Sequence, residues 1–196
     1  GSLIPVPDVQ NKIINDYIAD MAKYATNVES VRIRAAYNSI PVQLAKENKK
    51  FQYKLAQRGG TANIFGSAID WLHFAGVVLK CQRIEQGLMP ISVYSDLASF
   101  KLYMSDVGLL TMKSGISQQT ILSAGEIYNT FLGAISENYV AGAFTAKNYG
   151  LYYWTTDGIA ELDFVLQKGD EIISVEVKTG TRTKTKSLAM FVEKYK

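Results

Sequence analysis

Residues 161–178 carry the pattern that most constrains the fold, that of a β-hairpin. Apolar residues alternate with polar ones in the first half, Lys168-Gly169-Asp170 supplies a turn, and β-branched residues dominate 172–178. Since successive side chains of a strand point to opposite faces, Leu162, Phe164 and Leu166 are expected on one face. The hairpin therefore predicts two adjacent strands of a sheet.

The polar residues of this hairpin suggest chemistry at the ends of its strands. Glu176 and Lys178 lie two positions apart and are expected on one face, where Asp163 joins them if the register allows. Two carboxylates and an ammonium group on adjacent strands can form a divalent-metal site with a lysine that faces a phosphate.

Composition limits the other possibilities. The chain has 196 residues, 47% of them hydrophobic, which is enough for one large or two small domains with a proper core. The net charge of +3 is too small to indicate a polyanionic partner by itself, so such an argument must rest on local clusters. Cys81 and His73 are the only residues of their types, which excludes a disulfide framework and a cysteine/histidine zinc site.

No apolar run reaches transmembrane length and no signal peptide is visible, so we expect no membrane association and a cytoplasmic location. Gly1-Ser2 has the form of a remnant of tag cleavage, so the chain is expected to be part of a longer protein.

The N-terminal half reads as helices followed by a hairpin. We predict helices at 8–24, 31–37 and 62–75, with a cap and restart at Ser39-Ile40-Pro41. Short strands are expected at 51–55, 77–84 and 91–94. This order is the outline of a winged helix.

DNA binding by this outline has arguments on both sides. The expected recognition helix, 62–75, has no Lys or Arg, whereas a helix in the major groove normally supplies donors to phosphates and bases. Basic residues precede it instead and would either contact a phosphate backbone or form a solvated face: Lys46, Lys49, Lys50, Lys54 and Arg58. Packing against a partner domain is the alternative role of this half.

The C-terminal half completes a predicted α/β fold, α+β overall. After a strand at 100–104, a turn at 105–108 and an irregular stretch, a helix is expected at 125–144. Glu137 lies beside its apolar stripe, either partly exposed and salt-bridged or pointing toward the hairpin. A strand at 151–154 precedes the hairpin, and a basic loop with Arg182, Lys184 and Lys186 leads to a last helix, 188–195, capped by Ser187. The predicted division is 3–95, helical and winged-helix-like, and 96–196, a partial α/β domain.

Several short motifs, in order and spacing, resemble the C-terminal region of prokaryotic AAA-type P-loop ATPases, which ends in a domain of unknown function. The motifs are Ile40–Phe51, Ala68–Leu72, Phe100–Tyr103, Asp106–Leu110, Glu137–Val140, Tyr153-Trp154, Glu161–Phe164 and Glu176–Lys178. The resemblance implies an ATPase core in the same full-length protein as the partner of this region. No G-x-x-x-x-G-K-[ST] motif occurs here, so ATP would bind only through that separate P-loop domain.

The tail also resembles the PD-(D/E)XK nuclease superfamily, with a mixed sheet flanked by helices. The resemblance maps the helix glutamate onto Glu137, the second-strand acid onto Asp163 and the E-x-K strand onto Glu176 and Lys178. It implies that Asp163, Glu176 and the Val177 carbonyl hold Mg²⁺, with Mn²⁺ as a substitute, and that Lys178 orients water or pairs with phosphate. Glu137 would bind a second ion or position water. The proline of the motif name is absent, and the chain stops before the last strand of that core, so a truncated domain is expected.

Two hypotheses follow. The first is a nuclease-like domain that binds DNA or RNA and hydrolyses phosphodiesters with Mg²⁺, using Lys49, Lys50, Lys54, Arg182, Lys184 and Lys186 as contacts to the strand backbone. The second is a non-catalytic binding or regulatory module of the ATPase that contacts DNA or a protein partner.

Overall fold

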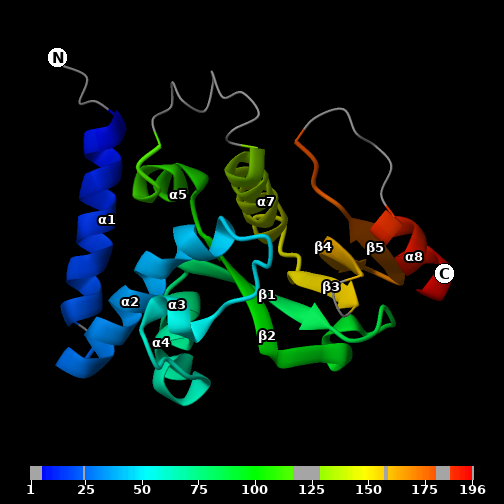
Figure 1. The fold of residues 1–196 in the computed structure, drawn as a ribbon, viewed down its shortest axis with the longest axis horizontal. Helices are drawn as coiled ribbons and strands as arrows, with labels where there is room; N and C mark the ends of the chain where they lie inside the picture. Colours follow the sequence, from blue (N-terminus) through cyan, green and yellow to red (C-terminus); the bar gives the residue numbers. More distant parts are fainter. Residues whose placement is uncertain (1–5, 24, 117–128, 157–158, 180–185, 196) are drawn as a thin grey trace.

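The computed structural model of the chain describes residues 6–23, 25–116, 129–156, 159–179 and 186–195. A helical N-terminal part is followed by a five-stranded mixed sheet with flanking helices (Figure 1). The predicted α+β fold class is therefore confirmed.

The helices of the N-terminal part largely follow the apolar periodicity of the sequence. Two predicted helices are confirmed, and the C-cap turn of the second ends at Gly76, whose φ of +69° is a conformation that glycine adopts without strain. The helices of this part are α1 (Val6–Lys23), α2 (Asn27–Leu44), α3 (Tyr53–Ala56) and α4 (Ala62–Phe74).

Helix α2 is longer than predicted at both ends. It begins after Thr26, which forms a reciprocal capping box with Glu29. The predicted restart at Ser39-Ile40-Pro41 is wrong, because the helix continues through Pro41 to Leu44. A proline inside a helix costs about 3 kcal/mol, and the complete burial of Ile40 and Leu44 offsets that cost.

The predicted strand at 51–55 is also wrong. Both backbone groups of Gln52 are taken by the side-chain amide of Gln43: Gln52 N donates to Gln43 Oε1 at 2.7 Å, and Gln43 Nε2 donates to the Gln52 carbonyl at 3.2 Å. The chain then turns into α3. Phe51 N donates to the Phe100 carbonyl at 2.8 Å, so the loop between α2 and α3 is anchored at its far end.

The sheet has the order β2-β1-β3-β4-β5, in which only β1 and β3 are parallel. Its strands are β1 (Val78–Ile84), β2 (Ser95–Met104), β3 (Tyr152–Thr156), β4 (Ala160–Lys168) and β5 (Glu171–Val175). The predicted strand at 91–94 is wrong, since these residues form the 3₁₀ helix η1 (Ile91–Tyr94) and β1 pairs instead with β2. The division at residue 95 remains a prediction, and strands from both sides of it share this one sheet.

In the described ranges, three further helices flank the sheet: α5 (Val107–Lys113), α7 (Asn129–Thr145) and α8 (Lys186–Tyr195). α5 replaces part of the irregular stretch expected after the turn at 105–108, and Asp106 caps it by accepting from Leu109 N at 2.9 Å. Ser187 lies in the first turn of α8 rather than capping it. Among the described residues, no helix is both long enough and apolar enough to cross a membrane.

A bulge in β4 decides which side chains reach the α7 side of the sheet. Tyr152 pairs with Val165 but Trp154 pairs with Leu162, so β4 has one extra residue opposite β3. Leu162 and Val165 pack in the cluster that contains Phe191 of α8, whereas Phe164 packs against Phe144 of α7. The expectation that Phe164 shares a face with Leu162 is therefore wrong.

Candidate functional site

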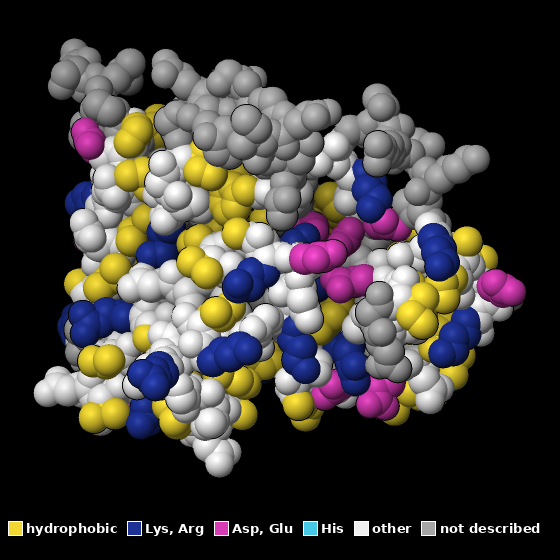
Figure 2. Space-filling model, viewed as in Figure 1, with side chains coloured by type: hydrophobic (Ala, Val, Ile, Leu, Met, Phe, Trp, Pro, Cys, Tyr) yellow, Lys and Arg dark blue, Asp and Glu magenta, His cyan; other side chains and the backbone are white. Residues whose placement is uncertain are grey.

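One polar cavity of about 700 Å³ gathers most of the residues that the sequence singles out. Its walls come from the α2–α3 loop, α7, the strands β1 to β4, the segment after β5 and the start of α8. Glu137, Asp163, Glu176 and Lys178 all line it, together with Lys49 and Lys50. Figure 2 shows carboxylates gathered where α7 meets β4 and β5, with lysine and arginine side chains around them.

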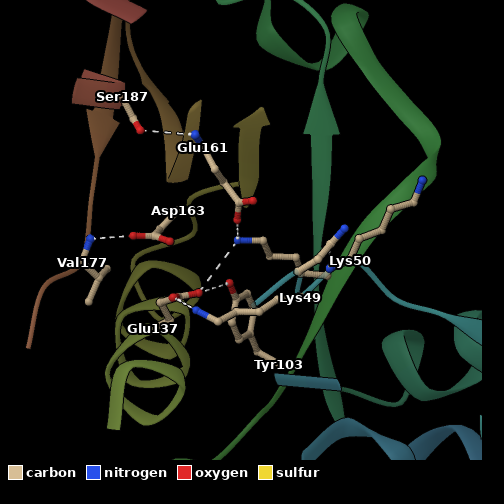
Figure 3. Close-up of polar contacts among 10 residues, drawn as sticks. Lys49, Lys50, Tyr103, Glu137, Glu161, Asp163, Val177 and Ser187 are labelled. Atoms are coloured by element: carbon tan, nitrogen blue, oxygen red, sulfur yellow. Dashed lines mark hydrogen bonds and ion pairs between the residues drawn. The ribbon is translucent and has the colours of Figure 1, made fainter. Parts of the chain in front are cut away.

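Glu137 is held from several sides at the inner wall of the cavity. Lys49 Nζ donates to its Oε1, and Tyr103 OH donates to its Oε2 at 3.1 Å (Figure 3). The next residue, Asn138, fixes α7 on the edge strand β2, because its side-chain amide exchanges two hydrogen bonds with the backbone of Met104, at 2.8 and 2.9 Å. Glu137 is buried, so these partners replace the water that would otherwise solvate its carboxylate.

A fully buried lysine lies beneath the cavity. Lys101 of β2 has 0% exposure, and its Nζ lies 2.5 Å from Glu161 Oε1, 3.9 Å from Glu137 Oε2 and 4.9 Å from the ring centre of Tyr153. Burial favours the neutral amine, but the charges of Glu161, Glu137 and Asp163 outweigh it and raise the pKa of Lys101 above its usual value. Lys101 therefore acts as an internal counter-ion for the acids above it.

Asp163 projects from the bulge of β4 toward the first residues after β5. Its Oδ2 accepts a hydrogen bond from Val177 N at 2.8 Å (Figure 3). Burial raises the pKa of Asp163 from 3.8 to about 6, and the nearby charge of Glu137 adds to the rise. Lys101, the Val177 amide and Lys49 act in the opposite direction.

Glu176 and Lys178 lie just past β5, which ends at Val175 instead of continuing to Lys178 as predicted. Lys178 Nζ pairs with Glu176 Oε1. Glu176 is 9% exposed at its side chain and Lys178 is 48% exposed, so the ammonium group reaches the open side of the cavity. Glu176 Oε2 is buried and accepts no hydrogen bond from the described residues.

The remaining predicted contacts are dispersed. Lys50 lines the cavity, but its side chain extends away from Glu137 (Figure 3). Lys54 on α3 and Lys186 at the start of α8 are exposed and do not line the cavity. Arg182 and Lys184 lie outside the described residues.

Sequence reasoning missed three members of the cluster: Lys101, Tyr103 and Glu161. The available signal was a charged residue inside the apolar run Phe100–Met104, where Lys101 and Tyr103 share one face of β2. A lysine in a strand buried on both sides normally has a paired acid, and Glu161 lies two positions before Asp163 on β4.

The donors suited to a metal are the oxygens of Asp163 and Glu176. Across the part of the chain that the structure describes, no group of three His, Cys, Asp or Glu side chains lies close enough to hold a metal ion. Mg²⁺ usually keeps several waters and binds through one or two carboxylates, so a pair of acids matches its preference. The buried, unpaired Glu176 Oε2 is an acceptor that a cation or a donor group would satisfy.

Comparison with known proteins gives matches to two families. Residues 132–196 match a domain of unknown function, DUF4143, which occurs in AAA-ATPase-associated proteins. No curated protein and no solved structure matches the chain significantly. Residues 5–120, more than half of the sequence, match a second domain of unknown function, DUF8612. The chain therefore belongs to the DUF8612 family and carries a DUF4143 match at its C-terminal end.

Proposed function

We propose that the cavity hydrolyses phosphodiester bonds of DNA or RNA, in a protein that works with an AAA-type ATPase. The observation that carries the proposal is that the predicted site residues meet at one cavity. Glu137, Asp163, Glu176 and Lys178 come from α7, β4 and the segment after β5, yet all line one cavity. Carboxylates can hold a metal ion and lysines can pair with phosphate oxygens, and both the ion and the lysines stabilise the negative charge that builds up when water attacks a phosphodiester.

Asp163 and Glu176, with the Val177 carbonyl, would hold Mg²⁺ or Mn²⁺. The orphaned Glu176 Oε2 and the oxygen-only donors fit a hard divalent cation. When bound, such an ion neutralises phosphate charge and makes a water molecule more acidic.

The side chains of the cavity supply positioning and charge. Lys178 is half exposed at the open side of the cavity. It would leave its ion pair with Glu176 and pair instead with a non-bridging phosphate oxygen. Lys50, on the opposite wall, would contact the neighbouring phosphate. Arg182, Lys184, Lys186 and Lys54 would add salt-dependent contacts to the strand backbone without base preference.

The partner in this proposal is the ATPase core of the same full-length protein. The C-terminal match to a domain that occurs in AAA-ATPase-associated proteins supports it. Nucleotide hydrolysis in that core would then move or gate the nucleic acid that reaches the cavity.

The test is cleavage of end-labelled single- and double-stranded DNA and RNA in Mg²⁺ and in Mn²⁺. Lys178→Met and Glu176→Gln are expected to lower the rate by at least about 100-fold, the usual effect of losing a group that stabilises transition-state charge. Lys80→Met is the matched control, since Lys80 pairs with Asp70 outside the cavity at 3.3 Å. Equal rates in Lys178→Met and the unaltered chain would refute the proposal.

A non-catalytic binding module is the second candidate, and one observation favours it. The predicted groups already have partners within the chain: Lys178 pairs with Glu176, and Asp163 accepts from the Val177 amide. If the unaltered chain retains labelled nucleic acid or a protein partner and never cleaves with either metal, this role replaces hydrolysis.

A further inference from the structure

The two oxygens of Glu137 are both occupied by donors of the chain itself. Oε1 accepts from Lys49 Nζ, and Oε2 accepts from Tyr103 OH at 3.1 Å, with Lys101 Nζ 3.9 Å away. The Glu137 side chain is only 5% exposed and that of Lys49 only 14%, so water competes little for these contacts. A cation at Glu137 would have to displace Lys49 and would lie close to Lys101.

Glu161 is compensated in the same way. Its Oε1 lies 2.5 Å from Nζ of Lys101, a lysine with no exposed surface. Two of the five acids that line the cavity, Glu137 and Glu161, are thus paired with lysines of the N-terminal part of the chain and of β2. The helix acid therefore has a partner before any ion or substrate arrives.

Asp163 and Glu176 differ from these two acids. Asp163 accepts from a backbone amide, which is neutral, and Glu176 keeps one buried oxygen that accepts from none of the described groups. Two ammonium groups, those of Lys49 and Lys101, lie beside Glu137, whereas Lys178 is the ion-pair partner of Glu176. The carboxylates left for a cation are therefore Asp163 and Glu176, whereas a cation at Glu137 would be repelled by the two ammonium groups already beside it.

We propose that the cavity takes a single divalent cation, at Asp163 and Glu176, and that Glu137 is a positioning residue that fixes Lys49 rather than a metal ligand. This inference rests on the proposed function, and it departs from the second-ion role that the family resemblance implies for Glu137. Lys49 and Lys101 together keep a second cation out. The α2–α3 loop thereby contributes to a site whose acids lie on α7, on β4 and after β5.

The experiment is the stoichiometry and affinity of Mn²⁺ binding by isothermal titration calorimetry, checked by electron paramagnetic resonance of free Mn²⁺. The unaltered chain is expected to bind one ion. Asp163→Asn should weaken it at least about 100-fold. Glu137→Gln should weaken it by less than the roughly 10–100-fold typical of a residue that holds a ligand, because Glu137 bonds to Lys49 and Tyr103 and to neither ligand. Lys49→Met exposes Glu137 Oε1 and is expected to admit a second, weaker ion.

The outcomes separate the two proposals. Two ions in the unaltered chain, with one lost in Glu137→Gln, would overturn the single-cation inference and leave hydrolysis standing. No ion in the unaltered chain would overturn both. If Glu137→Gln does not fold, the stoichiometry of the unaltered chain and of Lys49→Met still decides between one ion and two.

Discussion

The ionised carboxylate of Asp163 lowers the unfolding free energy of the chain, so replacing Asp163 should make the metal-free chain more stable. Its pKa is about 6 in the folded chain against 3.8 for the ordinary group. The difference is about two pKa units, which corresponds to about 3 kcal/mol of unfolding free energy. Asp163→Asn removes the charge but keeps an oxygen that can accept from Val177 N.

The direction in which the contribution of Asp163 to stability changes with pH follows from proton binding. Because the folded-state pKa is raised, the folded chain binds more protons than the unfolded chain between pH 4 and 6. The contribution of Asp163 is therefore favourable at low pH and is lost as the pH rises through about 6. The gain in unfolding free energy of Asp163→Asn is expected to approach about 3 kcal/mol at pH 7.5 and to be roughly half as large at pH 5.

The assay is urea denaturation in EDTA at pH 5 and at pH 7.5, with the midpoint and slope compared between variant and unaltered chain. Asp96→Asn is a control of opposite sign, since hydrogen bonds from Ser99 and Ala98 and the charge of Arg83 lower the pKa of Asp96. Its stabilising contribution is present at neutral pH and is lost as the pH falls through that lowered value. A midpoint for Asp163→Asn at or below that of the unaltered chain at pH 7.5, or a gain that does not change with pH, would refute the reasoning.

Three further predictions concern stability and are measured by the same denaturation at pH 7.5. Lys101→Met removes a fully buried counter-ion from Glu137, which is 5% exposed, and from Glu161, which is 37% exposed, and should cost about 1–3 kcal/mol. Lys80→Met, at a partly exposed pair, should cost less than about 1 kcal/mol; equal losses would contradict the counter-ion role. Asn138→Leu leaves the Met104 N–H and carbonyl unpaired and should cost at least about 1–3 kcal/mol, and an unchanged midpoint would mean that the amide does not hold α7. Thr26→Ala removes the N-cap of α2 and should cost about 0.5–2 kcal/mol, and no loss would mean that burial alone fixes the start of the helix.

Local sequence patterns predicted the helices and strands whose buried residues recur at regular helical or strand spacing. Helices α1, α4 and α7 and strands β1, β3 and β4 lie where apolar spacing indicated them. Capping rules failed at Pro41, because burial of Ile40 and Leu44 outweighs the local cost of proline. The strand pattern failed at 51–55, because the backbone of Gln52 bonds to a side chain nine residues earlier.

The spacing of the hairpin acids brought Asp163, Glu176 and Lys178 to one cavity, as the sequence suggested, although their roles remain predictions. Alternation did not reveal the bulge that turns Asp163 and Phe164 to the same side, because an unpaired residue shows only in the register with β3. Nor did it reveal the lysines beneath the acids. Lys101 on β2 and Glu161 on β4 are far apart in sequence and are separated by two strands in the sheet, and their side chains meet only because Lys101 extends across the face of the sheet over Tyr153.

The most direct test of the central claim is the cleavage rate of Asp163→Asn in Mg²⁺ under single-turnover conditions. This variant is expected to be more stable than the unaltered chain, so unfolding cannot explain lost activity. Our account predicts Mg²⁺-dependent cleavage by the unaltered chain and a rate at least about 100-fold lower in Asp163→Asn. Cleavage at the same rate by both chains would contradict it.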